Sequence, residues 1–110
     1  MLDKNNKVFV NIKGTRYEIE FVKNSNQLFG NILGVTDYSD HKIVILDDVE
    51  SFEDFKDTLI HELIHATLYE CGHEFYKDES MVFILTMLFK SILKNSVEIL
   101  ETYNELKKSL

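Results

Sequence analysis

Two histidines and a glutamate lie at the spacing of an HExxH motif, at His61, Glu62 and His65. Residues four apart on an α-helix share one face and lie about 6 Å apart along the axis, so both imidazoles can reach one cation. Zn²⁺ accepts histidine nitrogens at about 2.0–2.1 Å and makes a water molecule nucleophilic near neutral pH. Glu62, beside the first histidine, is placed to take the proton of that water. The motif therefore predicts a Zn²⁺ site for a hydrolytic reaction with Glu62 as general base.

A zinc site of this kind needs a third protein ligand, which leaves the fourth position for water or substrate. Four residues downstream of the motif offer a suitable side chain: Glu79, His73, Asp78 and Glu74. Glu79 is the preferred ligand, because a loop over residues 71–77 lets a following helix fold back and an acid is favoured in the first turn of that helix. His73 ranks second, and Asp78 and Glu74 follow.

The helix that carries the motif has clear start and stop signals. Ser51 is followed three residues later by an acid, as in a capping box, and Gly72 is a natural terminator after Cys71. A second helix is expected from near Asp78 to beyond residue 94, with a kink or break at residues 95–96. Its apolar block at residues 81–89 is expected to be core.

Before residue 51 the sequence has the features of strands and turns rather than helices. Alternating or β-branched runs predict four short strands, at residues 8–12, 16–22, 32–36 and 41–46. Turn residues separate them at residues 13–15, 24–27 and 37–40. The pattern predicts an α+β domain, in which an N-terminal antiparallel meander of three or four strands precedes the HExxH helix and one or two C-terminal helices.

Composition limits the classes of protein to which the chain can belong. The 110 residues are enough for one domain, residues 1–110, and the net charge of −7 disfavours binding to nucleic acid or to an anionic membrane. The apolar block at 81–89 is shorter than the ~18 residues of a membrane span. A single cysteine, Cys71, excludes an intramolecular disulfide. We therefore expect a cytoplasmic protein with no membrane or nucleic-acid partner.

Residues 58–72 and 78–82 together resemble small zincin metallopeptidases of phages and mobile elements. Those peptidases are related to minimal gluzincins and, more distantly, to the ImmA/IrrE-type peptidases. The resemblance implies a zincin-like fold, His61, His65 and Glu79 as zinc ligands, Glu62 as general base, and a peptide or protein substrate. Proteins of the SprT type use a histidine as third ligand, which keeps His73 as an alternative.

The sequence leaves several assignments open. Tyr76, His73, Tyr38 or the metal alone could stabilise the oxyanion, and the strand near residues 43–46 could align a substrate as a sheet edge. Larger gluzincins place an acid four residues after the third ligand, where this chain has Phe83, so another group must orient the histidines. The apolar stripe over residues 93–106 is either core or a dimer seam. The alternative function is a non-catalytic zincin-fold protein that acts in regulation or host interaction.

Overall fold

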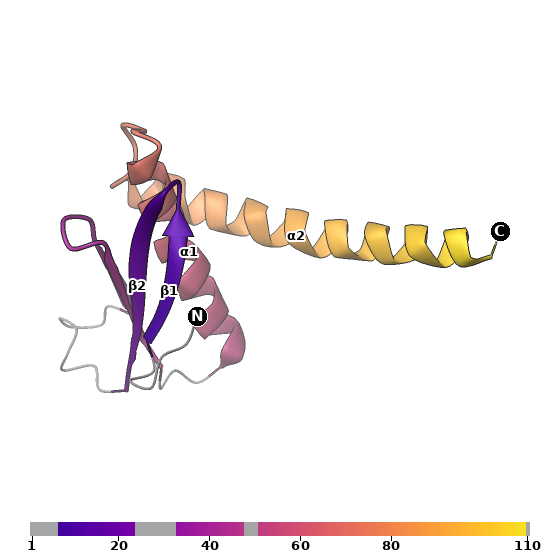
Figure 1. Ribbon diagram of the computed structural model, residues 1–110, viewed down its shortest axis with the longest axis horizontal. Helices are drawn as coiled ribbons and strands as arrows, with labels where there is room; N and C mark the ends of the chain where they lie inside the picture. The colour runs from indigo at the N-terminus through magenta and orange to yellow at the C-terminus, as the bar shows by residue number, and fades with distance from the viewer. Residues whose placement is uncertain (1–6, 24–32, 48–50, 110) are drawn as a thin grey trace.

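The computed structural model describes residues 7–23, 33–47 and 51–109. It is an α+β protein in which one four-stranded mixed sheet packs against one helix and a second, longer helix leaves the body of the molecule (Figure 1). The strands are β1 (Lys7–Ile12), β2 (Thr15–Val22), β3 (Gly34–Asp37) and β4 (Lys42–Leu46). The helices are α1 (Phe52–Glu70) and α2 (Glu79–Lys108). The predicted loop at 24–27 and the start of the predicted strand at residue 32 lie outside the described residues.

The first two strands form the predicted hairpin. Lys13 and Gly14 connect β1 to β2 with φ angles of 53° and 92°, which are the left-handed values that a two-residue hairpin turn needs. The Gly14 N–H also donates to Oδ1 of Asn11 at 2.8 Å. The antiparallel pairing then places Val8 opposite Ile19.

The predicted antiparallel meander is correct for β1 with β2 and for β3 with β4, which pair antiparallel, and wrong for the arrangement of these two pairs. The strand order is β1-β2-β4-β3, and β4 pairs with β2 in parallel. The reason lies in the composition of the two later strands. β4 reads KIVIL and buries Ile43, Ile45 and Leu46, as expected of an interior strand. β3 is short, alternates between exposed and half-buried residues, and lies at the edge.

The core lies between one face of the sheet and α1. Tyr17, Ile19, Ile43 and Ile45 from the sheet meet Ala66 of α1. The opposite face carries ion pairs of Lys7 and Lys42 with Glu18 and of Lys42 with Glu20, and a second, smaller apolar cluster of Val22, Leu46 and Val44. The helix α1 thus covers the larger apolar face of the sheet, and α2 packs on α1.

Both helices begin with a side-chain cap, of which the one at Ser51 was predicted. The Ser51 hydroxyl accepts from the Asp54 N–H at 3.0 Å, and Oδ1 of Asp78 accepts from the Met81 N–H at 2.9 Å. The first helix ends at Glu70, one residue before the predicted end, with Cys71 as its C-cap and Gly72 at φ 72°. These two caps and the reversal between them determine how α2 approaches α1.

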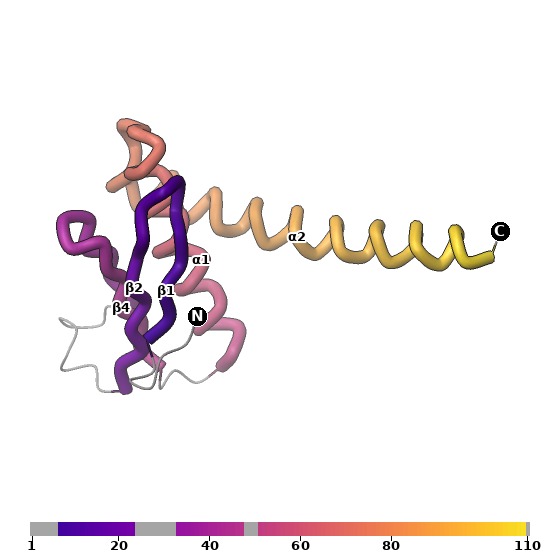
Figure 2. Tube along the Cα trace, viewed as in Figure 1, coloured from indigo at the N-terminus to yellow at the C-terminus, as the bar shows by residue number. Residues whose placement is uncertain are grey.

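Two predictions about the second helix are wrong. The α2 helix is continuous over 30 residues, with no break at residues 95–96 (Figure 2). The block at 81–89 is not core, because only Val82 and Thr86 of α2 are buried. Five large apolar residues of that block are 49–59% exposed: Phe83, Ile84, Met87, Leu88 and Phe89.

Candidate metal centre

The two histidines of the motif point to the same place from successive turns of α1. Nε2 of His65 lies 3.2 Å from Nε2 of His61. The side chain of His65 is 5% exposed and that of His61 is 21% exposed, so one ring is anchored in the interior and the other borders solvent. The helical spacing therefore brings the two nitrogens together as predicted.

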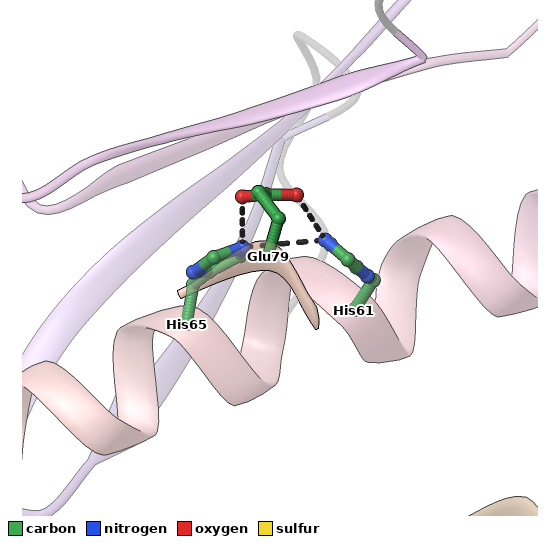
Figure 3. A group of neighbouring side chains, drawn as sticks. All are labelled: His61, His65 and Glu79. Atoms are coloured by element: carbon green, nitrogen blue, oxygen red, sulfur yellow. Dashed lines mark hydrogen bonds and ion pairs between the residues drawn. The ribbon is translucent and has the colours of Figure 1, made fainter. Parts of the chain in front are cut away.

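Glu79 completes a three-residue cluster from the first turn of α2 (Figure 3). Its Oε2 lies 3.0 Å from Nε2 of His61, and its Oε1 lies 2.7 Å from Nε2 of His65. The Glu79 side chain is 74% exposed, so the cluster is open to solvent on the carboxylate side. The preferred third residue is thus the one that the fold places beside both imidazoles.

The spacing of the three side chains fits a tetrahedral cation. Ligands at 2.0–2.1 Å from a tetrahedral ion lie about 3.3 Å from one another. The Nε2–Nε2 distance of 3.2 Å matches this value, while the two carboxylate oxygens, at 2.7 Å from His65 and 3.0 Å from His61, are closer than such ligands would lie. Two imidazoles and one carboxylate are also a donor set that Zn²⁺ prefers.

The backbone carbonyl of Tyr76 orients His65 from behind. Nδ1 of His65 lies 2.6 Å from this carbonyl oxygen, which can only accept, so Nδ1 carries the hydrogen. Nε2 of a neutral His65 then has no hydrogen and carries a lone pair. This lone pair faces Oε1 of Glu79, which lies 2.7 Å away. Two acceptors at that distance need a cation between them, either a proton or a metal ion.

The Tyr38 hydroxyl forms a hydrogen bond with the same carbonyl oxygen. This hydroxyl donates to the Tyr76 oxygen at 3.3 Å and lies 3.3 Å from Nδ1 of His65. Burial raises the pKa of Tyr38 to about 12, so the hydroxyl keeps its proton. Its ring packs against Tyr69 and Tyr76 at centroid distances of 4.8 and 5.0 Å. The sequence could not predict the carbonyl as an acceptor, because every residue has one and only the fold selects among them.

Glu62 lies beside the cluster but points to a different partner. It is 7% exposed, and its Oε1 accepts from the Thr36 hydroxyl of β3 at 2.7 Å. Burial raises the pKa of the Glu62 carboxyl, and the hydrogen bond from Thr36 and the nearby histidines oppose that rise. Gly34 of the same strand permits this close approach, since a Cβ there would lie 3.1 Å from Cγ of Glu62.

A groove of about 720 Å³ adjoins the cluster between β3, α1 and α2. His61, Glu62 and Glu79 line it together with apolar side chains that include Leu33, Phe83 and Met87. Two of the three candidate ligands, His61 and Glu79, and the candidate base Glu62 therefore line one open groove.

The other candidate ligands lie outside the cluster. Nδ1 of His73 accepts from the Phe75 N–H at 3.1 Å, and Asp78 is occupied as the cap of α2. Glu74 is an exposed residue of the connecting loop. Among the described residues, the only metal-type cluster is that of His61, His65 and Glu79.

Two expectations about substrate contacts change with the fold. The strand at 43–46 is interior, so the expectation that it forms an edge is wrong, and β3 is the edge strand near the site. The Tyr38 hydroxyl lies at Nδ1 of His65, on the opposite side of the ring from Nε2, so it orients the histidine rather than facing the cluster.

Comparison of the chain with models of known families, with curated proteins and with solved structures returned no match.

Proposed function

We propose that the protein is a minimal zinc metallopeptidase of the gluzincin type, which hydrolyses a peptide bond in one step. The observation that carries the proposal is the convergence of both Nε2 atoms and the Glu79 carboxylate within 2.7–3.2 Å. The backbone carbonyl of Tyr76 supports it, because its hydrogen bond leaves the Nε2 lone pair of His65 directed at the shared point.

His61, His65 and Glu79 would hold the ion. When bound, Zn²⁺ acts as a Lewis acid that polarises a carbonyl and makes water a nucleophile at neutral pH. Glu62 accepts the proton of the attacking water and passes it to the departing amine. Thr36 donates to Oε1 of Glu62 and holds the carboxylate in place, which leaves Oε2 to exchange protons.

The substrate in this proposal is a peptide that lies along the edge of β3. An edge strand offers unpaired backbone groups, and an extended peptide can pair with them. The groove between β3 and α2 exposes Phe83 and Met87, at 59% each, next to the candidate ligands. An apolar substrate side chain beside the scissile bond would fit this lining.

The test compares the wild-type protein with Glu62→Gln, loaded with zinc, on a proteome-derived peptide library read by mass spectrometry. We expect cleavage by the wild type, with an apolar residue beside the cut, and a rate at least ~100-fold lower for Glu62→Gln at equal zinc content. Glu74→Gln is the matched control, because Glu74 is an exposed acid of the connecting loop, and it should cleave as the wild type does.

The same experiment separates the proposal from a non-catalytic zinc-binding protein. No cleavage by the zinc-loaded wild type, or equal cleavage by wild type and Glu62→Gln, contradicts the assigned reaction. Loss of zinc from Glu62→Gln would contradict the separate roles given to Glu62 and to the three ligands.

A further inference from the structure

The C-terminal half of α2 has no cover within the described chain. Every residue over 91–108 is exposed, and α2 projects away from the sheet and α1 (Figures 1 and 2). Seven large apolar side chains in this half are 53–66% exposed: Ile92, Leu93, Val97, Ile99, Leu100, Tyr103 and Leu106. Most of the stability of a helix in a protein comes from packing its apolar face against other elements. We therefore expect this exposed surface to bind a partner.

The apolar residues follow a heptad spacing. Phe89, Ile92, Ser96, Ile99, Tyr103 and Leu106 are separated by three and four residues in turn, as at the a and d positions of a coiled coil. Leu93 and Leu100 widen this stripe on one side. The charged residues Lys94, Glu98, Glu101 and Glu105 lie on the opposite side of the helix at the same spacing.

A two-sided helix of this kind fits a protein partner better than a bilayer. By length and composition, α2 could cross a membrane, and 11% of its most apolar window is buried. This corrects the sequence-based view that the apolar stretch is too short to span. The only window of α2 that meets this test is residues 80–97, and its first part packs on α1, where Val82 and Thr86 are buried and Lys90 pairs with Glu53 and Asp57. The rest of the helix has a continuous polar face over 94–105, whereas a spanning helix is apolar on all sides.

We propose that residues 89–106 of α2 pair with the same segment of a second copy of the chain, as an antiparallel two-stranded coiled coil. In that arrangement a positions of one helix lie opposite d positions of the other. The stripe then pairs Phe89 with Leu106, Ile92 with Tyr103 and Ser96 with Ile99, which sets the smallest seam residue against an aliphatic one. A parallel arrangement would instead set Tyr103 against Tyr103 and Ser96 against Ser96.

The exposed area is sufficient for a stable pair of this size. Each aliphatic side chain carries on the order of 100 Å² of buriable apolar surface. The apolar residues of the stripe are between about half and two-thirds exposed, so pairing two helices removes roughly 1,000 Å² from water, which is the lower bound for a specific interface. The one stripe therefore supplies enough area without any contribution from the sheet or α1.

The proposed dimer leaves the groove accessible. At about 100° per residue, Phe83 and Met87 lie on the side of α2 opposite to Leu85, Ile92 and Ile99. Phe83 and Met87 line the groove, and the stripe residues over 92–106 do not. Pairing is thus independent of the proposed peptidase reaction.

The test measures the mass of the 110-residue chain by light scattering during size-exclusion chromatography at about 100 μM. We expect a dimer for the wild type and a monomer for Ile99→Glu, because that change puts a carboxylate in the centre of the seam. Ile99 is 66% exposed in the single chain, so the substitution leaves the fold intact. Ser91→Glu adds the same charge on the polar face and should remain dimeric.

Other results overturn the proposal. A monomeric wild type, an open series of larger assemblies, or a dimer that persists in Ile99→Glu would each contradict it. So would a chain that is extracted only with detergent, or that binds phosphatidylcholine vesicles, because those results assign the stripe to a membrane.

Cross-linking tests the direction of pairing in a Cys71→Ser background. In the antiparallel dimer the two Tyr103 positions lie about 16 Å apart along the axis, too far for a disulfide. Tyr103→Cys alone should therefore stay uncross-linked under oxidation, while Ile92→Cys combined with Tyr103→Cys should give a covalent dimer. A disulfide from Tyr103→Cys alone would contradict the antiparallel arrangement.

Discussion

Gly34→Ala is expected to destabilise the protein through one identifiable contact. Gly34 begins β3, where that strand passes closest to α1. A Cβ at this position would lie 2.8 Å from Cγ2 of Thr58 and 3.1 Å from Cγ of Glu62. Ordinary carbon–carbon contacts are about 3.5–4.0 Å, so β3 or the Thr58 side chain must move by roughly 0.7 Å.

The expected cost is that of overpacking a close-packed contact, about 1–3 kcal/mol of unfolding free energy. For a domain of this size each kcal/mol lowers the melting temperature by about 4–8 °C. Thr58→Ser removes the obstructing methyl group but keeps the hydroxyl, which donates to the Asp54 carbonyl at 2.9 Å. In the Thr58→Ser background, the cost of Gly34→Ala should therefore fall by on the order of 1 kcal/mol.

The assay is urea unfolding followed by far-ultraviolet circular dichroism for the wild type, both single variants and the double variant. The coupling energy of the double-mutant cycle is the quantity that decides the matter. If Gly34→Ala leaves the free energy of unfolding unchanged, or lowers it equally in both backgrounds, β3 does not approach α1 as closely as described. That result would also contradict the contact between this strand and Glu62.

Three further predictions concern side-chain hydrogen bonds. Thr36→Val removes the donor to Oε1 of Glu62 and should lower the rate of peptide cleavage about 10-fold at unchanged zinc content. Thr36→Ser keeps the hydroxyl and should retain activity. Equal rates for the two variants would argue against the role of the Thr36 hydroxyl in holding Glu62. Tyr17→Phe removes the hydroxyl that donates to Oε2 of Glu70 at 2.7 Å and should lower the unfolding free energy by about 1–2 kcal/mol in urea melts at pH 7, and an unchanged midpoint would contradict this. The hydrogen bonds from Tyr17 and Thr15 lower the pKa of Glu70 in the folded state, so their stabilisation is present above the ordinary carboxyl value of 4.5 and is lost as pH falls through the folded value. Melting temperatures measured between pH 5 and 3 should therefore fall less steeply for Tyr17→Phe than for the wild type, and parallel slopes would count against the linkage.

The sequence predicted those parts of the protein that local signals determine. Ser51 and Gly72 marked the ends of α1, Gly14 marked the hairpin, and the four-residue spacing of His61 and His65 predicted that their rings would converge. Glu79 was predicted as the third member because the loop over 71–77 lets the next helix fold back and an acid is favoured in its first turn.

The parts that depend on long-range packing could not be predicted in this way. Strand periodicity gives no order within a sheet, so the insertion of β4 between β2 and β3 was missed. Hydrophobicity alone did not distinguish a buried block from an exposed one. Phe83 and Met87 are residue types that are common in cores, but here they line a groove. The carbonyl of Tyr76 carries no side-chain signal at all.

The most direct test of the central claim is the zinc content of the purified protein after exhaustive dialysis, measured by mass spectrometry of the element. Stoichiometric zinc is expected in the wild type and in His73→Ala, because the His73 ring lies outside the cluster and accepts from the Phe75 N–H. His65→Ala and Glu79→Gln should each lose the zinc. A wild type that retains no zinc after loading, or a His65→Ala variant that retains as much as the wild type, would contradict the assignment of these side chains to a metal ion.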